Sequence, residues 1–317
     1  MSSSNLRRAR RHFGNWARLF LFGTFVTAAR PQDSAGLRIS VDVKSVVLNV
    51  SVRDPRGKPV PHLQARNFRV DENGQPQAIA AFESADSPVA VGLLVDASQS
   101  MYNKLPEVAA AAGAFVRGSD PRDEVFIVNF NENVHLTLLD SGMTATSPAA
   151  LADVILHPVA AGKTALYDAV DTALAHIRKS PIERKVLLVI SDGGDNASRI
   201  SQRQLLADIS RSAVEIYTIG LFDEDDSDGN AGALRRMAVT SGGQAFQPRP
   251  GESVRICQQI AADIRAQYVL AYSPANQTFC GEYRAIRAHA TTDRGVRLTV
   301  RTRAGYTAAP SSGEGCR

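Results

Sequence analysis

The fold of this 317-residue chain is decided by one stretch, VAVGLLVDASQS, which runs from Val89 to Ser100. It begins with apolar residues and glycine, the composition of a parallel strand that is buried on both faces. The apolar run stops at Asp96, and two serines follow at alternate positions, Ser98 and Ser100. Open α/β sheets bind ligands beyond the carboxyl ends of their strands. We therefore expect the segment from Asp96 to Ser100 to be a binding loop.

Strands and helices alternate on the carboxyl side of this stretch. Further strands are predicted at 124–130, 135–139, 185–190, 215–221 and 267–272, and helices at 105–117, 148–156, 165–179, 202–212, 233–240 and 251–267. Such alternation predicts an α/β domain with a doubly wound, Rossmann-like, mostly parallel sheet that is flanked by helices. We expect this domain to span residues 88–275.

The segments on either side of the α/β domain have β character. Residues 37–53 alternate apolar with polar side chains, and Asn73-Gly74 predicts a hairpin turn between strands at 68–72 and 76–82. A second hairpin is predicted around a turn at 292–295, with strands at 283–290 and 296–303. We expect residues 37–87 and the hairpin at 278–307 to form one small β-sandwich-like module, followed by a flexible tail at 308–317.

Residues 1–30 predict a signal peptide. They hold six arginines and no acidic residue, and an eleven-residue, largely apolar run at 19–29 ends in small residues. A membrane-spanning helix takes about 20 apolar residues, so we expect only transient membrane contact. Arg10-Arg11 leaves twin-arginine export open beside the general secretory route. The mature protein is expected in the periplasm or outside the cell.

The charge distribution argues against nucleic-acid binding. The formal net charge of +4 comes from the first 30 residues, because the rest of the chain has 30 basic and 32 acidic side chains. Nucleotide binding is not expected either. Gly162-Lys163-Thr164 matches the end of a phosphate-binding loop, but His157 stands where that loop needs glycine.

Two later loops carry oxygen-bearing side chains at the ends of predicted core elements. Thr164 precedes the helix at 165–179, and Asp192 follows the strand at 185–190. If these loops converge on the first one, two carboxylates and three hydroxyls meet at one point. Magnesium prefers six oxygen ligands at about 2.0–2.1 Å. Five such side chains would leave the cation electrophilic, with room for a carboxylate from outside.

The pattern Asp96-x-Ser98-x-Ser100, then Thr164, then Asp192, resembles the metal-ion-dependent adhesion site of the von Willebrand factor type A domain. This resemblance implies that Ser98, Ser100 and Thr164 ligate the metal, while Asp96 and Asp192 act directly or through water. It implies Mg²⁺, with Mn²⁺ or Ca²⁺ as alternatives. It further implies an adhesion-type function, in which the ion binds an Asp or Glu carboxylate of a protein partner.

The flanking segments resemble a bacterial subgroup, the VWFA-related domain proteins, over nearly all of residues 37–307. The matching residues are Asp54, Gly57, Val60, Leu63, Phe68, Val70, Glu72, Gly74, Gln267, Tyr268, Val269, Leu270, Arg303, Gly305 and Tyr306. This resemblance supports the architecture more than the function.

We expect a binding protein and not an enzyme. A metal-dependent hydrolase needs a general base near the metal, and the sequence places no histidine or spare glutamate there. It also has no Gly-x-Ser-x-Gly elbow, and its histidines lack zinc spacing: His12, His62, His135, His157, His176 and His289. A scaffold of a cell-envelope assembly, whose site only holds loops together, stays open as the alternative.

Three cysteines, Cys257, Cys280 and Cys316, leave one unpaired in an oxidising compartment. The sequence is compatible with a Cys280–Cys316 or a Cys257–Cys280 disulfide. A disulfide is favoured over a metal or redox role, because no Cys-x-x-Cys is present.

Two acidic features lie close to the candidate site in sequence. Asp168 follows Thr164 on the next helix and is expected either to hydrogen-bond within the site or to have a helix-surface or capping role. The stretch 223–229, DEDDSDG, predicts a solvated acidic loop near the metal. It is not an EF-hand loop, because the twelfth position counted from Glu224 is Arg235.

Overall fold

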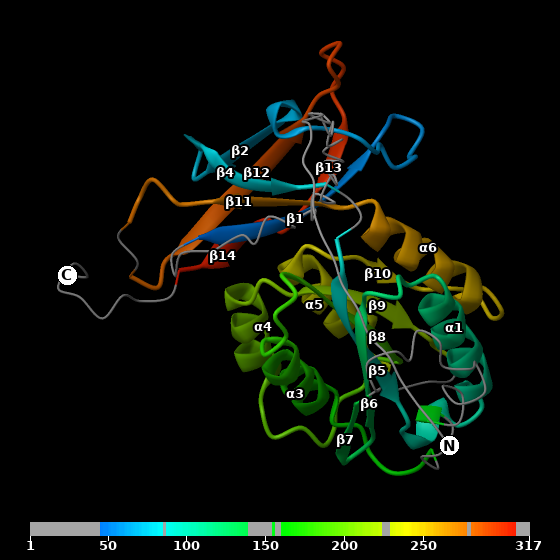
Figure 1. The fold of residues 1–317 in the computed structure, drawn as a ribbon. Helices are drawn as coiled ribbons and strands as arrows, with labels where there is room; N and C mark the ends of the chain where they lie inside the picture. The colour runs from blue at the N-terminus through cyan, green and yellow to red at the C-terminus, as the bar shows by residue number, and fades with distance from the viewer. Residues whose placement is uncertain are drawn as a thin grey trace, which may run out of the picture. The chain divides into compact units, whose positions relative to one another are not determined.

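The computed structural model describes residues 45–84, 87–138, 154–155, 160–223, 229–277 and 280–308. Its largest sheet has six strands in the order β10-β9-β8-β5-β6-β7 (Figure 1). Their bounds are β5 Val89–Asp96, β6 Glu124–Phe130, β7 Val134–Leu138, β8 Arg184–Ser191, β9 Glu215–Gly220 and β10 Ala245–Phe246. Every neighbouring pair is parallel except β6 with β7, so the predicted doubly wound, mostly parallel sheet is confirmed.

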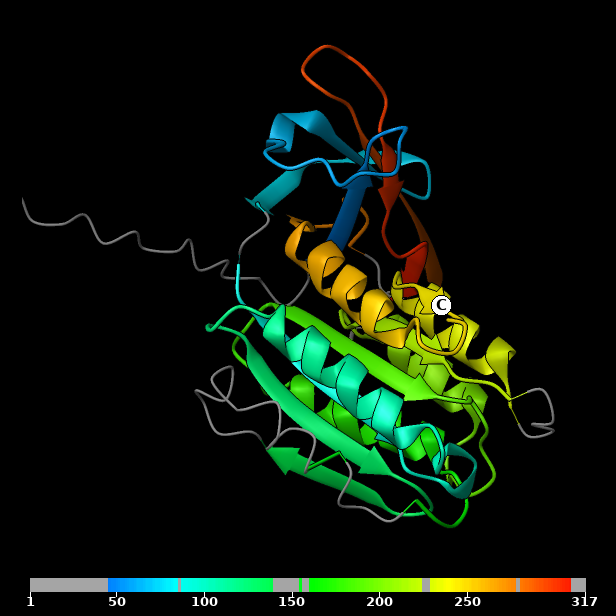
Figure 2. The same ribbon diagram turned by 90° about the vertical axis from the view of Figure 1, so that its right-hand side faces the viewer.

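Helices cover both faces of this sheet. Helices α1 (Leu105–Arg117) and α6 (Ser253–Arg265) pack on one face, and α3 (Leu166–Ile177), α4 (Gln202–Arg211) and α5 (Ala231–Ser241) pack on the other (Figures 1 and 2). Most of the helix predicted at 148–156 lies outside the described residues. Within the described part of the chain, no helix is long and apolar enough to cross a membrane.

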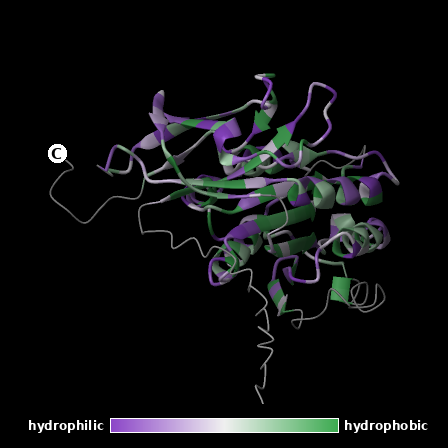
Figure 3. Cartoon of the chain, turned by 45° about the horizontal axis from the view of Figure 1, so that its top comes forward, coloured by the Kyte–Doolittle hydropathy of each residue, from purple (hydrophilic) through white to green (hydrophobic). Residues whose placement is uncertain are grey.

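The central strand β5 explains why the opening stretch reads as an unbroken apolar run. It lies between β6 and β8, and all of its residues are buried. Figure 3 shows hydrophobic colouring along the strands of this sheet and mixed colouring on the helices around it. A strand with helices on both faces has no solvent-facing side, so its residues do not alternate.

Helix α4 shows how local sequence sets an element boundary. The Ser201 hydroxyl accepts a hydrogen bond from the Gln204 N–H at 3.3 Å, and the Gln204 side chain accepts one from the Ser201 N–H at 2.8 Å. This reciprocal capping box satisfies N–H groups that have no partner within the helix. Leu205 and Ile209 lie four residues apart on one face of the helix and are buried against the sheet.

The remaining strands form two antiparallel sheets of four strands each. One has the order β13-β1-β11-β4 and the other β14-β12-β2-β3. The bounds are β1 Val46–Arg53, β2 Phe68–Glu72, β3 Gln75–Gln77, β4 Ile79–Glu83, β11 Tyr268–Tyr272, β12 Tyr283–Ala290, β13 Thr299–Arg301 and β14 Gly305–Thr307. Residues from both sheets share one hydrophobic core, including Leu48, Val70, Leu270 and Ile286. Segments before and after the α/β domain therefore both contribute to this β module.

Strand β11 belongs to the β module and not to the α/β domain, so the expected limit of that domain at residue 275 is wrong. It lies between β1 and β4, with Leu270 paired with Leu48 and with Phe82. All five of its residues are buried. An apolar strand that is buried on both faces fits the centre of either sheet, so its pattern alone does not assign it to one of them.

The predicted turn at Asn73-Gly74 is present. Asn73 has φ 49° and Gly74 has φ 81°, and Glu72 pairs with Gln75 across the turn. Two successive positive φ values are what a two-residue type I′ turn requires. The single strand expected at 76–82 is instead divided into β3 and β4, which lie in different sheets.

The prediction of a C-terminal hairpin is confirmed only at its turn. The Thr292 N–H donates to the Val296 carbonyl at 2.9 Å, and the Gly295 N–H donates to the Thr292 carbonyl at 2.8 Å. Beyond an isolated bridge between Thr291 and Arg297, the two strands separate. Strand β12 pairs with β2 and β14, whereas β13 pairs with β1 in the other sheet.

The structure excludes one of the two disulfides that the sequence allows. Cys280 is disulfide-bonded, and Cys257 is a free thiol that is buried in α6. The Cys257–Cys280 pairing is therefore wrong, and Cys316 lies outside the described residues. Burial raises the pKa of the Cys257 thiol to about 12, which keeps it protonated and unreactive.

A buried polar network joins the β module to the α/β domain. Arg301 of β13 donates to Glu215 Oε1 at 2.8 Å, to the Tyr217 hydroxyl at 2.8 Å and to the Ser51 hydroxyl at 2.9 Å. Gln267 Nε2 donates to Glu215 Oε2 at 2.7 Å and to the Tyr217 hydroxyl at 2.9 Å. Glu215 is the first residue of β9, so this network lies at the amino ends of the parallel strands.

Gly243 is predicted to be required for the close packing of the segment after α5 against β9. A Cβ atom at this position would lie 2.0 Å from the carbonyl oxygen of Ile216. We expect Gly243→Ala to lower the free energy of unfolding by about 1–3 kcal/mol, because the backbone itself must move. Gly232→Ala within α5 is the matched control and should change it by less than about 1 kcal/mol, towards stabilisation. Urea denaturation measures both, and equal stability of the two variants would contradict the packing argument.

Candidate metal centre

Two neighbouring parallel strands bring the two carboxylates to the same edge of the sheet. Val95 of β5 pairs with Ile190 of β8, so the strands end at the same level. Asp96 is the last residue of β5, and Asp192 follows Ser191 at the end of β8. This edge carries the carboxyl ends of the parallel strands, where open α/β sheets bind ligands.

The Asp96 carboxyl is fully buried. Its Oδ1 accepts a hydrogen bond from the Ser98 N–H at 2.9 Å, and its Oδ2 accepts one from the Ser191 hydroxyl at 2.5 Å. Burial, with a smaller contribution from the nearby Asp192 carboxylate, raises the pKa of Asp96 to about 6, although the serine hydrogen bonds oppose this shift. The charged form of Asp96 is thus costly without a cation nearby.

A chain of hydroxyl groups connects the first loop to Asp192. The Ser98 and Ser100 hydroxyl oxygens are 3.1 Å apart, and the Ser100 hydroxyl donates to Asp192 Oδ2. The other oxygen of Asp192 accepts a hydrogen bond from the Gly194 N–H at 2.9 Å. Side-chain hydrogen bonds therefore bring together Ser98, Ser100 and Asp192.

Thr164 lies on a loop that is tied to both of the others through the backbone. The Gln99 N–H donates to the Gly162 carbonyl at 3.3 Å, which joins this loop to the serine loop. The Thr164 N–H donates to Asn196 Oδ1 at 2.9 Å, and the Asn196 and Ala197 N–H groups donate to the Thr164 carbonyl, both at 3.0 Å. Hydrogen bonds thus place the Thr164 backbone between the other two loops.

The sequence patterns do not predict the roles of two supporting residues, Ser191 and Asn196. Ser191 holds Asp96, and Asn196 holds the Thr164 backbone. Ser191 had a recognisable signal, because it is a hydroxyl residue at the end of an apolar strand. Asn196 lies 32 residues from Thr164, and no local pattern predicts that contact.

Asp168 and Asp223, the described acidic residues that were expected near the site, interact with residues outside the candidate metal ligands. Asp168 accepts hydrogen bonds from the Arg199 and Ile200 N–H groups at 3.1 and 3.2 Å, so it holds the segment before α4 rather than capping a helix. Asp223 is 65% exposed and forms an ion pair with Lys104 at 3.0 Å. Residues 224–228 of the acidic stretch lie outside the described residues.

The donor set fits a hard divalent cation. Asp96 and Asp192 are almost completely buried, and neither has an ion pair with a basic residue in the described part of the chain. The Ser98 and Ser100 hydroxyls lie beside Asp192, and Thr164 is held on the adjacent loop by its backbone. Hard cations accept neutral oxygen ligands as well as carboxylates. No group of three or more His, Cys, Asp or Glu residues that could hold a metal is present among the described residues.

Residues 91–256, more than half of the chain, match the model of the von Willebrand factor type A domain. The chain belongs to this family. Von Willebrand factor type A domains often mediate protein interactions. No curated protein matches the chain.

Solved structures resemble this von Willebrand factor type A chain at low sequence identity. A von Willebrand factor type A structure from Catenulispora acidiphila has 14% identity and a TM-score of 0.50, and the match covers 77% of this chain and 75% of that one. An aerotolerance-related membrane protein from Bacteroides fragilis has 18% identity and a TM-score of 0.43, with 56% and 98% covered. The von Willebrand factor domain of a type V pili tip protein from Porphyromonas gingivalis has 14% identity and a TM-score of 0.44, with 56% and 95% covered. The first of these likenesses supports the fold alone.

Asn196 is predicted to hold the Thr164 loop in place. Asn196→Ala removes the acceptor of the Thr164 N–H and should lower the free energy of unfolding by about 1–3 kcal/mol, because a partly buried donor loses its partner. Asn133→Ala, in an exposed turn, is the control and should change it by less than about 0.5 kcal/mol. Thermal and urea unfolding measure the difference, and similar stability of the two variants would show that this hydrogen bond does not hold the loop.

Proposed function

We propose that this protein is an exported binding module that holds a divalent cation at Asp96, Ser98, Ser100, Thr164 and Asp192. Through this ion it recognises an Asp or Glu carboxylate of a protein partner. The observation that carries the proposal is the pair of buried carboxylates, which are connected through the N–H and hydroxyl of Ser98 and the hydroxyl of Ser100. Neither carboxylate has a basic partner among the described residues. The architecture and the flanking motifs suggest a bacterial VWFA-related protein.

The five residues of the site would have two different roles in holding the ion. Ser98, Ser100 and Thr164 would supply neutral ligands, and Asp96 and Asp192 would hold the ion directly or through water. Mg²⁺ suits this oxygen set, with Mn²⁺ and Ca²⁺ as alternatives. A bound dication would supply Lewis acidity towards an incoming carboxylate. Neutral hydroxyl ligands preserve that Lewis acidity, because they do not neutralise the ion.

The supporting residues would keep these ligands in position. Ser191 donates to Asp96 and thereby orients its carboxyl group. Gly194 does the same for Asp192 through its N–H, and Asn196 fixes the Thr164 backbone. Such outer contacts orient metal ligands and typically contribute about 10–100-fold to metal affinity.

The composition of residues 1–30 supports export through a signal peptide. These residues lie outside the described part of the chain. Export would place the protein in the periplasm or outside the cell. A partner there would be a protein that exposes an acidic side chain.

Binding is favoured over hydrolysis by what surrounds the cluster. None of the four histidines in the described residues is hydrogen-bonded to Asp96 or Asp192. His176 packs against the Phe126 ring, with 4.6 Å between the ring centroids. His289 lies on β12 in the β module. We therefore propose no catalytic residue.

Metal binding is predicted to require Asp96. Calorimetric titration of the full chain with Mg²⁺ or Mn²⁺ should show one saturable site, and Asp96→Ala should lower its affinity by about 100-fold or more, since outer contacts alone contribute 10–100-fold. Asp208→Ala on α4 is the control and should bind as the wild type does. The metal should also raise the melting temperature of the wild type. Absence of saturable binding, or equal binding by Asp96→Ala, would refute the metal site.

Carboxylate recognition is predicted to require the bound metal. Acetate added to the Mn²⁺-loaded chain should displace metal-bound water and lower the water proton relaxation rate, whereas the neutral isostere acetamide should not. If acetate and acetamide behave alike while Mn²⁺ binds normally, the ion only holds the loops together. That result would favour the scaffold function over recognition.

A further inference from the structure

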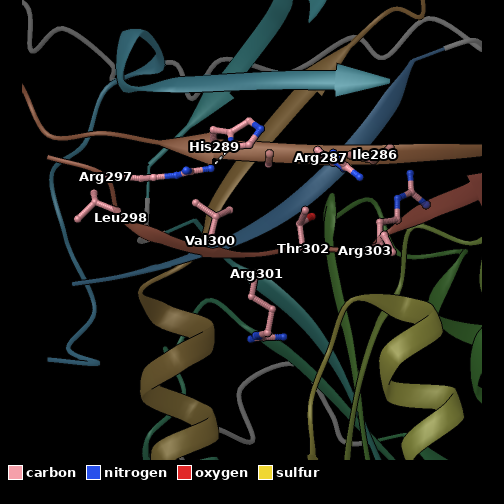
Figure 4. A pocket seen from close by; sticks show the side chains of 11 residues that line it. Ile286, Arg287, His289, Arg297, Leu298, Val300, Arg301, Thr302 and Arg303 are labelled. Carbon is pink, nitrogen blue, oxygen red and sulfur yellow. Dashed lines mark hydrogen bonds between the residues drawn. The ribbon is translucent and has the colours of Figure 1, made fainter. Parts of the chain in front are cut away.

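A cavity of about 420 Å³ lies in the β module, between β12 and the segment 297–304 that contains β13 (Figure 4). It exists because the two segments leave one turn and enter different sheets. The Leu298 N–H donates to the Ala290 carbonyl at 3.0 Å, and the Ile286 N–H donates to the Ala304 carbonyl at 2.7 Å. Between these two contacts, no backbone hydrogen bond joins the described segments, so the gap stays open.

Unneutralised cations line this cavity. Arg287 has no hydrogen bond or ion pair with any described residue, and Arg297 has only a 3.4 Å contact with His289 Nδ1. Figure 4 shows Arg297 and His289 meeting at one end of the cavity. Arg301 is different, because it forms an ion pair with Glu215 and points away towards the helices in the same view.

Two further groups in the lining lack the partners that buried polar atoms normally have. The Arg303 guanidinium donates only to backbone carbonyls, those of Ser212 at 3.0 Å and Val47 at 3.1 Å, and its buried Nε has no partner. The buried Thr302 hydroxyl also has no partner. Burial lowers the pKa of Arg303, which reflects the cost of a buried charge without a carboxylate.

Asp71 stands opposite Arg287 in the pairing of β12 with β2, so it offsets part of this charge, but other cations share it. Asp71 lies 3.6 Å from His289 Nε2, but its Oδ1 already accepts hydrogen bonds from Arg69 at 3.0 and 2.9 Å. Asp71 is also absent from the lining of the cavity. Arg287, Arg297 and Arg303 therefore surround a volume that holds positive charge in excess.

We propose that this cavity binds a phosphate-type oxyanion that carries more than one negative charge. Guanidinium groups donate paired hydrogen bonds to phosphate oxygens, and the Thr302 hydroxyl adds a further donor. Three cations exceed what a singly charged carboxylate would neutralise, whereas they match a phosphomonoester or a pyrophosphate. The site is independent of the metal centre, because it lies in the β module and uses none of the same residues.

Calorimetric titration of the full chain with inorganic pyrophosphate, in metal-free buffer, tests the proposal. We expect one saturable site, at least about ten-fold weaker binding in the double variant Arg287→Gln/Arg297→Gln, and little binding of acetate. Arg235→Gln, an exposed arginine of α5, is the control and should bind as the wild type does. Absence of saturable binding would overturn the proposal. Equally weakened pyrophosphate binding in the Arg235→Gln control would also overturn it. Asp96→Ala should bind pyrophosphate normally, which separates this test from that of the metal centre.

A second variant distinguishes a ligand contact from a structural role. Thr302→Val keeps the shape of the side chain and removes the hydroxyl, so we expect weaker pyrophosphate binding without a lower melting temperature. Unchanged affinity together with a lower melting temperature would contradict the assignment of Thr302 to the site.

The source of the phosphate group is identified with vesicles. Binding to phosphatidic acid vesicles, but not to phosphatidylcholine vesicles, with release by pyrophosphate would identify a lipid headgroup. Pyrophosphate binding without vesicle binding would identify a soluble phosphate compound. Failure of both probes would overturn the proposal.

Discussion

The parallel pairing of β5 with β8 is the constraint on which the candidate metal centre depends. It ends both strands at one edge and brings the Asp96 carboxyl within hydrogen-bonding distance of the Ser191 hydroxyl. Side chains alternate between the faces of a sheet, so a one-residue change of register would turn Ser191 away from Asp96. The apolar residues of both strands hold this register, because they fill the two cores beneath the helices.

Burial without a basic partner gives the site its chemical character. A basic side chain beside Asp96 and Asp192 would stabilise their charges but would also replace the cation. Ser98 and Ser100 instead link the two carboxyl groups through a backbone N–H and neutral hydroxyls, and burial raises the pKa of Asp96. The cavity of the β module shows the opposite imbalance, with guanidinium groups that lack carboxylates. In each place, a ligand of opposite charge would compensate charges that the described residues leave unpaired: buried carboxylates in the first, and the exposed Arg287 and Arg297 beside Arg303 in the second.

Sequence patterns predicted the elements and the convergence of the site loops better than they predicted the partners of the strands. The apolar run of β5 and the turn at Asn73-Gly74 carry strong local signals. Strand β11 does not, because it is buried on both faces and matches either sheet equally well. The Asn196 contact with Thr164 and the separation of β12 from β13 depend on residues distant in sequence, which no local pattern specifies.

The measurement that tests the central claim most directly is a crystal structure of the chain grown with Mn²⁺, with anomalous scattering used to locate the ion. The account predicts one strong anomalous peak among the hydroxyls of Ser98, Ser100 and Thr164, with Asp96 and Asp192 adjacent. A fully formed cluster without such a peak, or an ion bound only elsewhere on the chain, would contradict it.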